Sequence, residues 1–334
     1  MKLVCWIKRK KLFVIINTDV EAKCSQNENM SGGTNERKYL KLLEEIYENG
    51  EECTSRTGIN VRQLFNRQLH ADLRNFTMPL LTVRKMNWNS IVHELCWFLR
   101  GQTNAKELAK KNINIWNANS TREYLDDLGF LHYNVGELGP TYGHQWRRFG
   151  VPYVSEGERL KTTTDAYDTV SDRVVVDQVE ELIAALRSPL RRENRRMILS
   201  SWNPLDTPYT PLPPCHVMFQ THVRADDRTL VGTVTQRSAD LVLGVPSNIA
   251  SYSLFLHILG AMSNLNVGEI TINMGNCHIY ENHLKGVRLM LERAPYYSPV
   301  LESFEMKSLE DLSEEKFKLQ NYQCHDFIKF DLNA

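Results

Sequence analysis

A cysteine stands in a proline-rich turn, close in sequence to a segment that carries an arginine and an acid. The turn reads PLPPCH and contains Cys215, and the segment reads QRSAD at residues 236–240 and contains Arg237. Proline fixes φ and removes backbone donors, so such a turn can hold one side chain in a rigid orientation. A nearby guanidinium favours thiolate over thiol, and thiolate is the nucleophilic form. The pattern indicates a nucleophilic cysteine, against the alternative that Cys215 is a small buried apolar side chain.

The overall composition limits the classes of function. The chain has 334 residues, with 42% hydrophobic and 24% charged side chains, which is ordinary for a globular protein with a sizeable core. The 40 basic and 40 acidic residues balance, which argues against a general nucleic-acid binder. Basic pairs such as Arg195-Arg196 are usually solvated, but they can also bind one small phosphate.

The cysteines indicate a reducing compartment. There are 7 of them, with no CxxC pair, so neither a disulfide framework nor a zinc-ligand spacing is visible. We therefore expect reduced thiols, no metal cofactor and a cytoplasmic location, with a mitochondrial or nuclear pool left open. The apolar run at residues 12–16 is too short to cross a membrane, so no membrane association is expected.

The elements that must position these groups follow from periodicity. Residues 1–35 end in a polar, Gly/Asn/Ser-rich stretch and are expected to form a mobile extension, with one domain over residues 36–334. Helical spacing predicts helices over residues 39–47, 88–100, 178–186 and 248–265, and the start of another within 108–115. Strands are predicted within 61–76 and over 197–202, 217–223 and 230–236, and a loop over 153–177. The interleaved order, without a βαβ repeat, predicts an α+β fold in which a mixed sheet packs with helices.

Eight motifs resemble those of the thymidylate synthases, in the same order, over roughly residues 38–328. They are RTGIN, SIVHELCWFLRGQTN, IWNAN, GPTYGHQWRRFG, NRRMILSSWNP, LPPCH, QRSADLVLGVPSNIASY and HIYENH. The resemblance implies a homodimer with a sheet face at its interface. It also implies reductive methylation of dUMP to dTMP, with 5,10-methylenetetrahydrofolate as the donor of both methylene and hydride. Covalent catalysis suits this reaction, because adding a thiolate at C6 makes C5 of the pyrimidine enolate-like.

The resemblance also implies residue roles at the reacting centre. Cys215 would be the nucleophile, Glu94 the general acid/base and Tyr142 part of the network that removes the C5 proton. His216 would lie near O4 through a water, with a structural role as the alternative. The folate would contact Trp116, Asp240, Gly244 and the position of Ser247, and Asp240 would hydrogen-bond the pterin.

For the nucleotide, the resemblance implies contacts to phosphate, base and sugar. Arg56, Arg237 and Ser238 would bind the phosphate, together with Arg195 and Arg196 donated across the dimer interface. Asn248 would read the uracil, because an amide pairs with both N3–H and O4. The deoxyribose 3′-hydroxyl would meet His278 and Tyr280.

Departures from the family pattern fall mostly on the folate side. Ser247 stands where the family has phenylalanine, Asn117 and Asn276 replace aspartates, and Arg84-Lys85 inverts the usual order. The chain also ends in a polar sequence where the family has an apolar one that closes over the site. Two alternatives therefore stay open: a hydroxymethylase acting on dUMP or dCMP, in which water captures the intermediate, and a non-catalytic paralogue that binds nucleotide.

Overall fold

The computed structural model describes residues 32–56, 58–155, 175–192, 194–226 and 228–333. Most of the expected extension, residues 1–31, and most of the loop expected over 153–177 lie outside these residues. The first helix, α2, spans Gly32–Asn49, so the expected boundary after residue 35 falls inside a helix. Its apolar face buries Tyr39, Leu43 and Ile46, as the helical spacing predicted.

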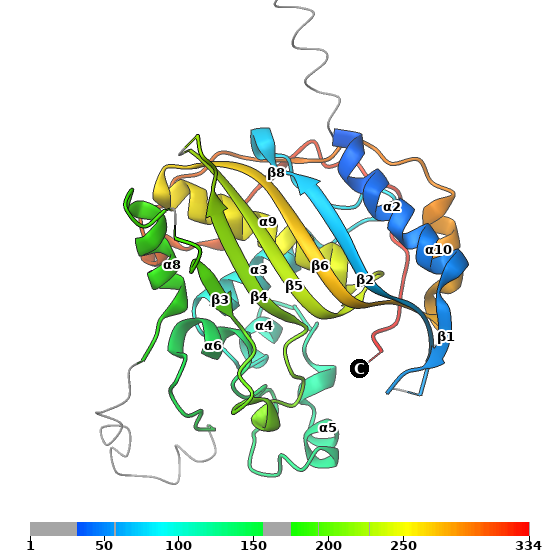
Figure 1. Ribbon diagram of the computed structural model, residues 1–334. Helices are drawn as coiled ribbons and strands as arrows, with labels where there is room; N and C mark the ends of the chain where they lie inside the picture. Colours follow the sequence, from blue (N-terminus) through cyan, green and yellow to red (C-terminus); the bar gives the residue numbers. More distant parts are fainter. Residues whose placement is uncertain (1–31, 57, 156–174, 193, 227, 334) are drawn as a thin grey trace, which may run out of the picture. The chain divides into compact units, whose positions relative to one another are not determined.

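A six-stranded mixed sheet forms the centre of the fold (Figure 1), in the order β1-β2-β6-β5-β4-β3. Its strands are β1 (Glu51–Thr54), β2 (Asn60–Asp72), β3 (Ile198–Ser200), β4 (His216–Val223), β5 (Thr229–Asp240) and β6 (Asn266–Tyr280). β5 and β6 pair in parallel, and the other neighbouring strands pair antiparallel. A smaller sheet pairs β7 (Val300–Leu301) with β8 (Leu319–Gln320).

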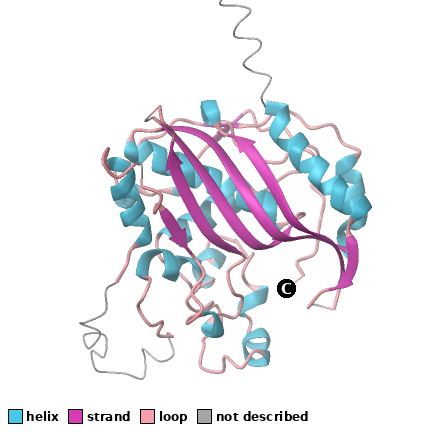
Figure 2. Ribbon diagram, in the orientation of Figure 1, coloured by secondary structure: helices cyan, strands magenta, loops and turns pink. Residues whose placement is uncertain are grey.

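Helices cover one face of the large sheet, which gives the expected α+β layers (Figures 1 and 2). Besides α2, the helices are α3 (Trp88–Leu99), α4 (Lys106–Ala109), α5 (Arg122–Asp127), α6 (Tyr142–Arg148), α8 (Gln178–Arg187), α9 (Gly244–Ser263) and α10 (Leu284–Leu291). Short 3-10 turns include η2 (Arg74–Phe76), η3 (Ala118–Ser120), η5 (Thr207–Tyr209), η6 (Glu281–His283), η7 (Leu309–Asp311) and η8 (Glu314–Lys316). α9 is buried almost all round, which explains why its sequence is apolar without a polar face.

The predicted elements are mostly confirmed, with two informative differences. The helix expected within residues 108–115 is wrong over most of that range, because α4 ends at Ala109 and Asn112 takes a left-handed φ of 59°. The longest strand, β6, was not anticipated, because glycines and asparagines interrupt its apolar pattern. A Cβ on Gly268 would lie 2.7 Å from the side chain of Thr229, and one on Gly275 would lie 3.1 Å from Arg237 O. Close approach to β5 therefore requires glycine inside this strand.

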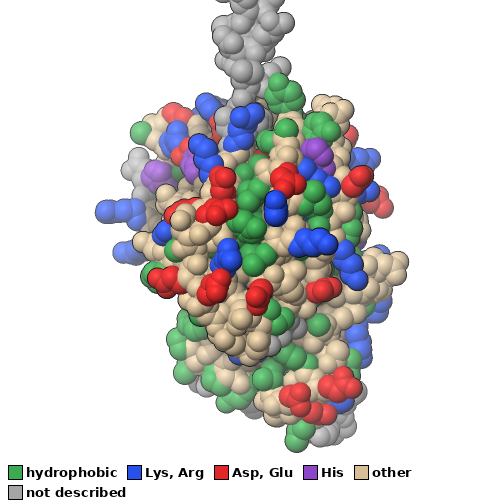
Figure 3. All heavy atoms as spheres, turned by 90° about the vertical axis from the view of Figure 1, so that its right-hand side faces the viewer, with side chains coloured by type: hydrophobic (Ala, Val, Ile, Leu, Met, Phe, Trp, Pro, Cys, Tyr) green, Lys and Arg blue, Asp and Glu red, His purple; other side chains and the backbone are tan. Residues whose placement is uncertain are grey.

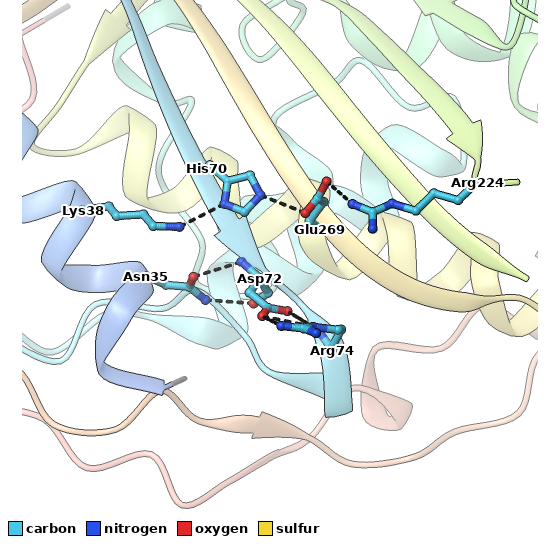
Figure 4. Close-up of polar contacts among 7 residues, drawn as sticks. All are labelled: Asn35, Lys38, His70, Asp72, Arg74, Arg224 and Glu269. Carbon is cyan, nitrogen blue, oxygen red and sulfur yellow. Dashed lines mark hydrogen bonds and ion pairs between the residues drawn. The ribbon is translucent and has the colours of Figure 1, made fainter. Parts of the chain in front are cut away.

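Polar contacts fasten α2 to the sheet near its β2 edge (Figure 4). The Nζ of Lys38 lies 3.0 Å from Nδ1 of His70, whose Nε2 lies 3.0 Å from the Glu269 carboxylate. Asn35 exchanges two hydrogen bonds of 2.8 and 2.9 Å with the backbone of Asp72. Helix α2 is thus held at both β2 and β6.

The surface that carries α2 and α10 mixes positive and negative side chains, with apolar ones between them (Figure 3). This agrees with the balanced charge of the whole chain. Among the residues described, no helix combines the length and the apolar character that a membrane crossing requires.

Candidate active site

Three neighbouring strands bring the predicted residues to one end of the sheet. β4 begins at His216, β5 ends at Asp240 and β6 ends at Tyr280. Because β4 runs antiparallel to β5, and β5 runs parallel to β6, these three termini meet at the same end. The register pairs His216 with Gln236 and Asp240 with His278.

The proline-rich turn and Arg237 meet directly. The guanidinium donates from Nε to Pro214 O at 2.9 Å and from Nη2 to Pro213 O at 2.7 Å, and the same Nη2 lies 4.0 Å from Cys215 Sγ. Trp202 lies against the guanidinium, with its ring centroid 5.6 Å away. The arginine therefore anchors the turn and faces the thiol.

The electrostatics at Cys215 differ from the sequence-based expectation. Burial raises the pKa of the thiol, and the charge of Arg237, followed by that of Arg56, only partly offsets this effect. The expectation that Arg237 lowers the pKa of Cys215 holds for the direction of its contribution and is wrong for the net result. Desolvation outweighs one guanidinium whose donors also serve two carbonyl groups.

Tyr142 and His216 form the other wall around Cys215. The backbone N–H of Cys215 donates to Tyr142 Oη at 2.7 Å, and the Tyr142 ring stacks on His216 at 4.0 Å between centroids. His216 Nδ1 lies 2.7 Å from Tyr252 Oη. Burial lowers the pKa of His216 to about 3, so the imidazole is neutral near pH 7. Burial also raises the pKa of Tyr142 well above its usual value, so its hydroxyl keeps its proton and can donate one hydrogen bond.

Glu94 projects from α3 toward the same group of residues. Trp116 Nε1 donates to Glu94 Oε1 at 2.8 Å, and the Trp116 ring lies 6.2 Å from that of Tyr142. Burial raises the pKa of Glu94 to about 7, and the hydrogen bond from Trp116 opposes the rise. A carboxyl group with a pKa near 7 can give and take a proton at neutral pH, as a general acid/base must.

Near the end of β6, Asn276, which stands where the family has aspartate, has a structural role. Its Oδ1 lies 2.9 Å from His278 Nδ1, and its Nδ2 donates to Gln63 Oε1 at 2.6 Å. An amide can accept from one neighbour and donate to the other, whereas an aspartate at this position could only accept. The ring of Tyr280 meets that of His278 edge-on at 5.2 Å. Burial lowers the pKa of His278, and it raises that of Tyr280.

Arg56 and Ser238 occupy the rim of this group. Arg56 is exposed in the turn between β1 and β2, which the Ser55 N–H closes by donating to Ile59 O at 3.0 Å. The positive charge of Arg56 lowers the pKa of both Cys215 and Tyr280 against the effect of burial, so it acts within electrostatic range of the site. Ser238 lies on β5, opposite Asn276 in the register.

The start of α9 places the expected folate-side residues. A Cβ on Gly244 would lie 3.6 Å from the Cβ of Asp240 and 3.9 Å from Asn248 Nδ2, so Gly244 separates these two side chains. Asp240 Oδ1 accepts from the Val242 N–H at 2.8 Å. The Ser247 hydroxyl donates to Leu243 O at 3.1 Å and is therefore used within its own helix.

Arg195 and Arg196 lie elsewhere in the single chain. Both are exposed beside β3, and Arg195 lines a hollow of about 400 Å³ together with Gln220 and Thr233. Within the described ranges, neither guanidinium makes a hydrogen bond or ion pair, and no contact joins either one to the Cys215 group. One chain alone therefore does not bring this pair to the candidate site.

Three residues at the site were missed from the sequence. Tyr252 follows Asn248 by one helical turn, a spacing that could have revealed it. Trp202 is the last residue of a predicted strand and carries no special signal, and in the structure it lies just beyond the end of β3 at Ser200. Gln236 is fully buried, and both polar atoms of its amide have no hydrogen-bond partner in the described part of the chain. A buried amide without partners next to Cys215 and His216 is a candidate ligand contact.

Comparison with known proteins gives a consistent result. A family model described as thymidylate synthase matches residues 37–334. A bifunctional dihydrofolate reductase-thymidylate synthase of Paramecium tetraurelia is 41% identical over 88% of this chain and 60% of its own length. A probable thymidylate synthase of Schizosaccharomyces pombe is 39% identical over 90% of this chain and 48% of its own length. The thymidylate synthase of varicella-zoster virus (strain Dumas) is 38% identical over 90% of this chain and 94% of its own length. The chain thus spans only about half of several longer relatives and nearly all of the viral one.

Proposed function

Because the chain belongs to the thymidylate synthase family, we propose that it is a methyltransferase that converts dUMP to dTMP and uses 5,10-methylenetetrahydrofolate as methylene and hydride donor. The observation that carries the proposal is the geometry around Cys215. Its thiol faces Arg237 at 4.0 Å, its backbone N–H is bound by Tyr142, and a carboxyl group with a pKa of about 7 lies across the Trp116 ring. A thiol, a guanidinium and a carboxyl group that can exchange a proton near pH 7 thus lie close together, which supports their proposed roles as nucleophile, cation and acid/base.

In the first step the Cys215 thiol loses its proton and Sγ bonds to C6 of the uracil ring. The C5–C6 π electrons move toward C4–O4, which makes C5 nucleophilic. Burial keeps the free thiol protonated, and the positive charges of Arg237 and Arg56 are the groups that favour the thiolate which the addition requires. The folate supplies a one-carbon unit and then a hydride when bound.

This chain's own residues bind the substrates and handle the protons. We propose that Arg56, Arg237 and Ser238 bind the phosphate and that His278 and Tyr280 bind the sugar hydroxyl. Tyr142 and Glu94 serve proton transfer, and loss of the C5 proton followed by expulsion of Sγ regenerates the thiolate. The neutral His216 acts through hydrogen bonds and does not donate a proton as a cation.

Asn248, Asp240 and the start of α9 fit the base and the folate. The Asn248 amide offers one donor and one acceptor to uracil. Asp240 offers a carboxylate to the pterin N–H groups. The Trp116 ring provides an aromatic wall for the folate, and Gly244, which has no side chain, lets the folate approach the start of α9. This arrangement supports folate as the co-substrate.

A homodimer is part of the proposal. Arg195 and Arg196 are exposed and without partners among the described residues, and Arg195 lines a hollow on a face of the sheet together with residues of β2, β4, β5 and β6. A second copy placed against this face would let the pair reach the phosphate of the neighbouring site. A cytoplasmic location, from the cysteine usage, completes the proposal.

The test is a covalent adduct. Incubation with 5-fluoro-dUMP and methylenetetrahydrofolate should modify Cys215, as located by peptide mass spectrometry. Cys215→Ala should lose both adduct and turnover and still bind dUMP, whereas the matched control Cys324→Ala should keep all three. Formation of hydroxymethyl-dUMP without dihydrofolate would replace the proposal by the hydroxymethylase alternative.

A further inference from the structure

The C-terminal segment is fastened along the folded domain. The Tyr322 hydroxyl donates to Leu81 O and accepts from the Met86 N–H, both at 2.8 Å. Three residues further on, the His325 N–H donates to Thr82 O at 2.7 Å. These bonds lead the chain past residues 81–86 toward α10.

Phe330 then occupies a slot formed by Gly286, Arg84 and His283. A Cβ on Gly286 would lie 2.3 and 2.6 Å from two ring carbons of Phe330, far inside contact distance. The Arg84 guanidinium lies 5.5 Å from the ring centroid, and the His283 ring meets Phe330 edge-on at 5.1 Å. The ring therefore fills the space that a side chain on α10 would otherwise take. We call this site the Phe330 slot.

Two further contacts hold the residues after Phe330. His283 Nε2 donates to Asp331 O at 2.8 Å. The side-chain amides of Asn282 and Asn333 pair at 3.1 and 3.2 Å. The polar ending thus has specific partners on the domain.

The Phe330 slot touches both halves of the candidate active site. On the nucleotide side, the His283 ring lies 5.7 Å from that of Tyr280. On the folate side, Arg84 is buried and donates from Nη2 to Val242 O at 2.6 Å, while the Val242 N–H donates to Asp240 at 2.8 Å. One tail residue is therefore linked to the sugar-binding and pterin-binding candidates together.

We propose that Phe330 is a positioning residue: seated in the slot of Gly286, Arg84 and His283, it holds the C-terminal segment at the edge of the active site and supports folate binding. The effect on folate rests on the proposed function, whereas the anchoring of the tail does not. Figure 1 shows the C-terminal segment approaching the same end of the sheet as the ends of β5 and β6.

Gly286→Ala tests the slot without weakening the helix. Alanine favours a helix interior over glycine, so α10 should fold at least as well, but the new methyl group would displace the Phe330 ring. Carboxypeptidase should then remove the last residues at least about tenfold faster than from the unchanged protein, since local protection follows the population of the anchored state. The KM for methylenetetrahydrofolate should rise about tenfold, and the Kd for dUMP should change by less than about twofold.

Matched variants separate positioning from general damage. Phe330→Ala should behave like Gly286→Ala, and the double variant should be no worse than either single one, because both act on the same contact. Phe330→Met should keep most of the protection against carboxypeptidase and most of the folate affinity that Phe330→Ala loses, because a flexible apolar side chain can refill the slot. Phe327→Ala, on a ring that is 66% exposed in the same segment, should change nothing.

Two results would overturn the proposal. Equal carboxypeptidase rates for Gly286→Ala and the unchanged protein would show that the slot does not hold the tail. A freed tail with an unchanged folate KM would show that anchoring has no part in folate binding. If the unchanged protein makes no dTMP, the proposed function fails, and the carboxypeptidase rates still decide whether the slot anchors the tail.

Discussion

Replacing Glu94 by glutamine should stabilise the protein at high pH while removing activity. Burial raises the pKa of this carboxyl group from 4.5 to about 7, so the folded state holds a proton that the unfolded state releases. Between these two values the folded state binds more protons, and stability therefore falls as pH rises through this range. Glutamine is neutral at every pH and can still accept the hydrogen bond from Trp116.

The size of the effect follows from the two pKa values. A rise from 4.5 to about 7 corresponds to about 3 kcal/mol of ionisation cost in the folded state at high pH, since a tenfold change in acidity is worth about 1.4 kcal/mol. The advantage of Glu94→Gln in unfolding free energy should therefore be under about 1 kcal/mol at pH 5 and approach about 3 kcal/mol at pH 9. Turnover should fall by about 10²–10⁴-fold, the usual contribution of a general acid/base.

Urea denaturation of both proteins at pH 5, 7 and 9 measures this difference directly. Subtracting the unfolding free energy of the unchanged protein from that of the variant at each pH cancels the contributions of all other titrating groups. Glu123→Gln, at an exposed position in α5, is the matched control, and its difference should not grow with pH in this way. A stability difference that is constant with pH would show that Glu94 titrates normally. A variant with full activity would remove Glu94 from the proton transfers.

Three other experiments test the remaining parts of the site. Ser247→Phe should lower the KM for methylenetetrahydrofolate and leave the affinity for dUMP unchanged, because the added ring packs on the folate side only; a higher folate KM in a well-folded variant would mean that the pocket has been rebuilt. Mixing Cys215→Ala with Arg195→Ala protomers should restore part of the activity, because one site of each heterodimer then keeps both residues; sedimentation that shows only monomer would rule this out. Tyr252→Phe should cost about 1–2 kcal/mol in chemical denaturation, because it removes the buried hydrogen bond to His216 of 2.7 Å, and should reduce kcat more than the KM for dUMP.

Local chemistry in the sequence was sufficient for several features. Prolines around Cys215 predicted a rigid turn, and the structure confirms that Arg237 meets this turn through two carbonyl groups. Apolar spacing predicted α3, α8 and most of α9, because a helix repeats its buried face within a few residues. These features depend on neighbours in the chain or on long, uniform patterns.

Strand β6 is an element that such local patterns do not predict. Its glycines and asparagines argue against a strand, yet it lies between β2 and β5, and close approach to β5 makes the glycines necessary. The strand is stabilised by its pairing with β2 and β5, whose residues are far away in the sequence and lie outside any local window of sequence. The missed contact of His216 with Tyr252 has the same origin, because it joins β4 to α9 across the core.

The sequence by itself determined the family and the order of the motifs, and it predicted Cys215 as the nucleophile, since residue types and spacing carry that information. Only the tertiary structure decided the protonation states: a raised pKa at Cys215, a neutral His216 and a Glu94 that titrates near pH 7. It also decided that Phe330 fills the space above Gly286. Burial is the physical reason in each case, because the free energy of a charge or a ring depends on what surrounds it in space.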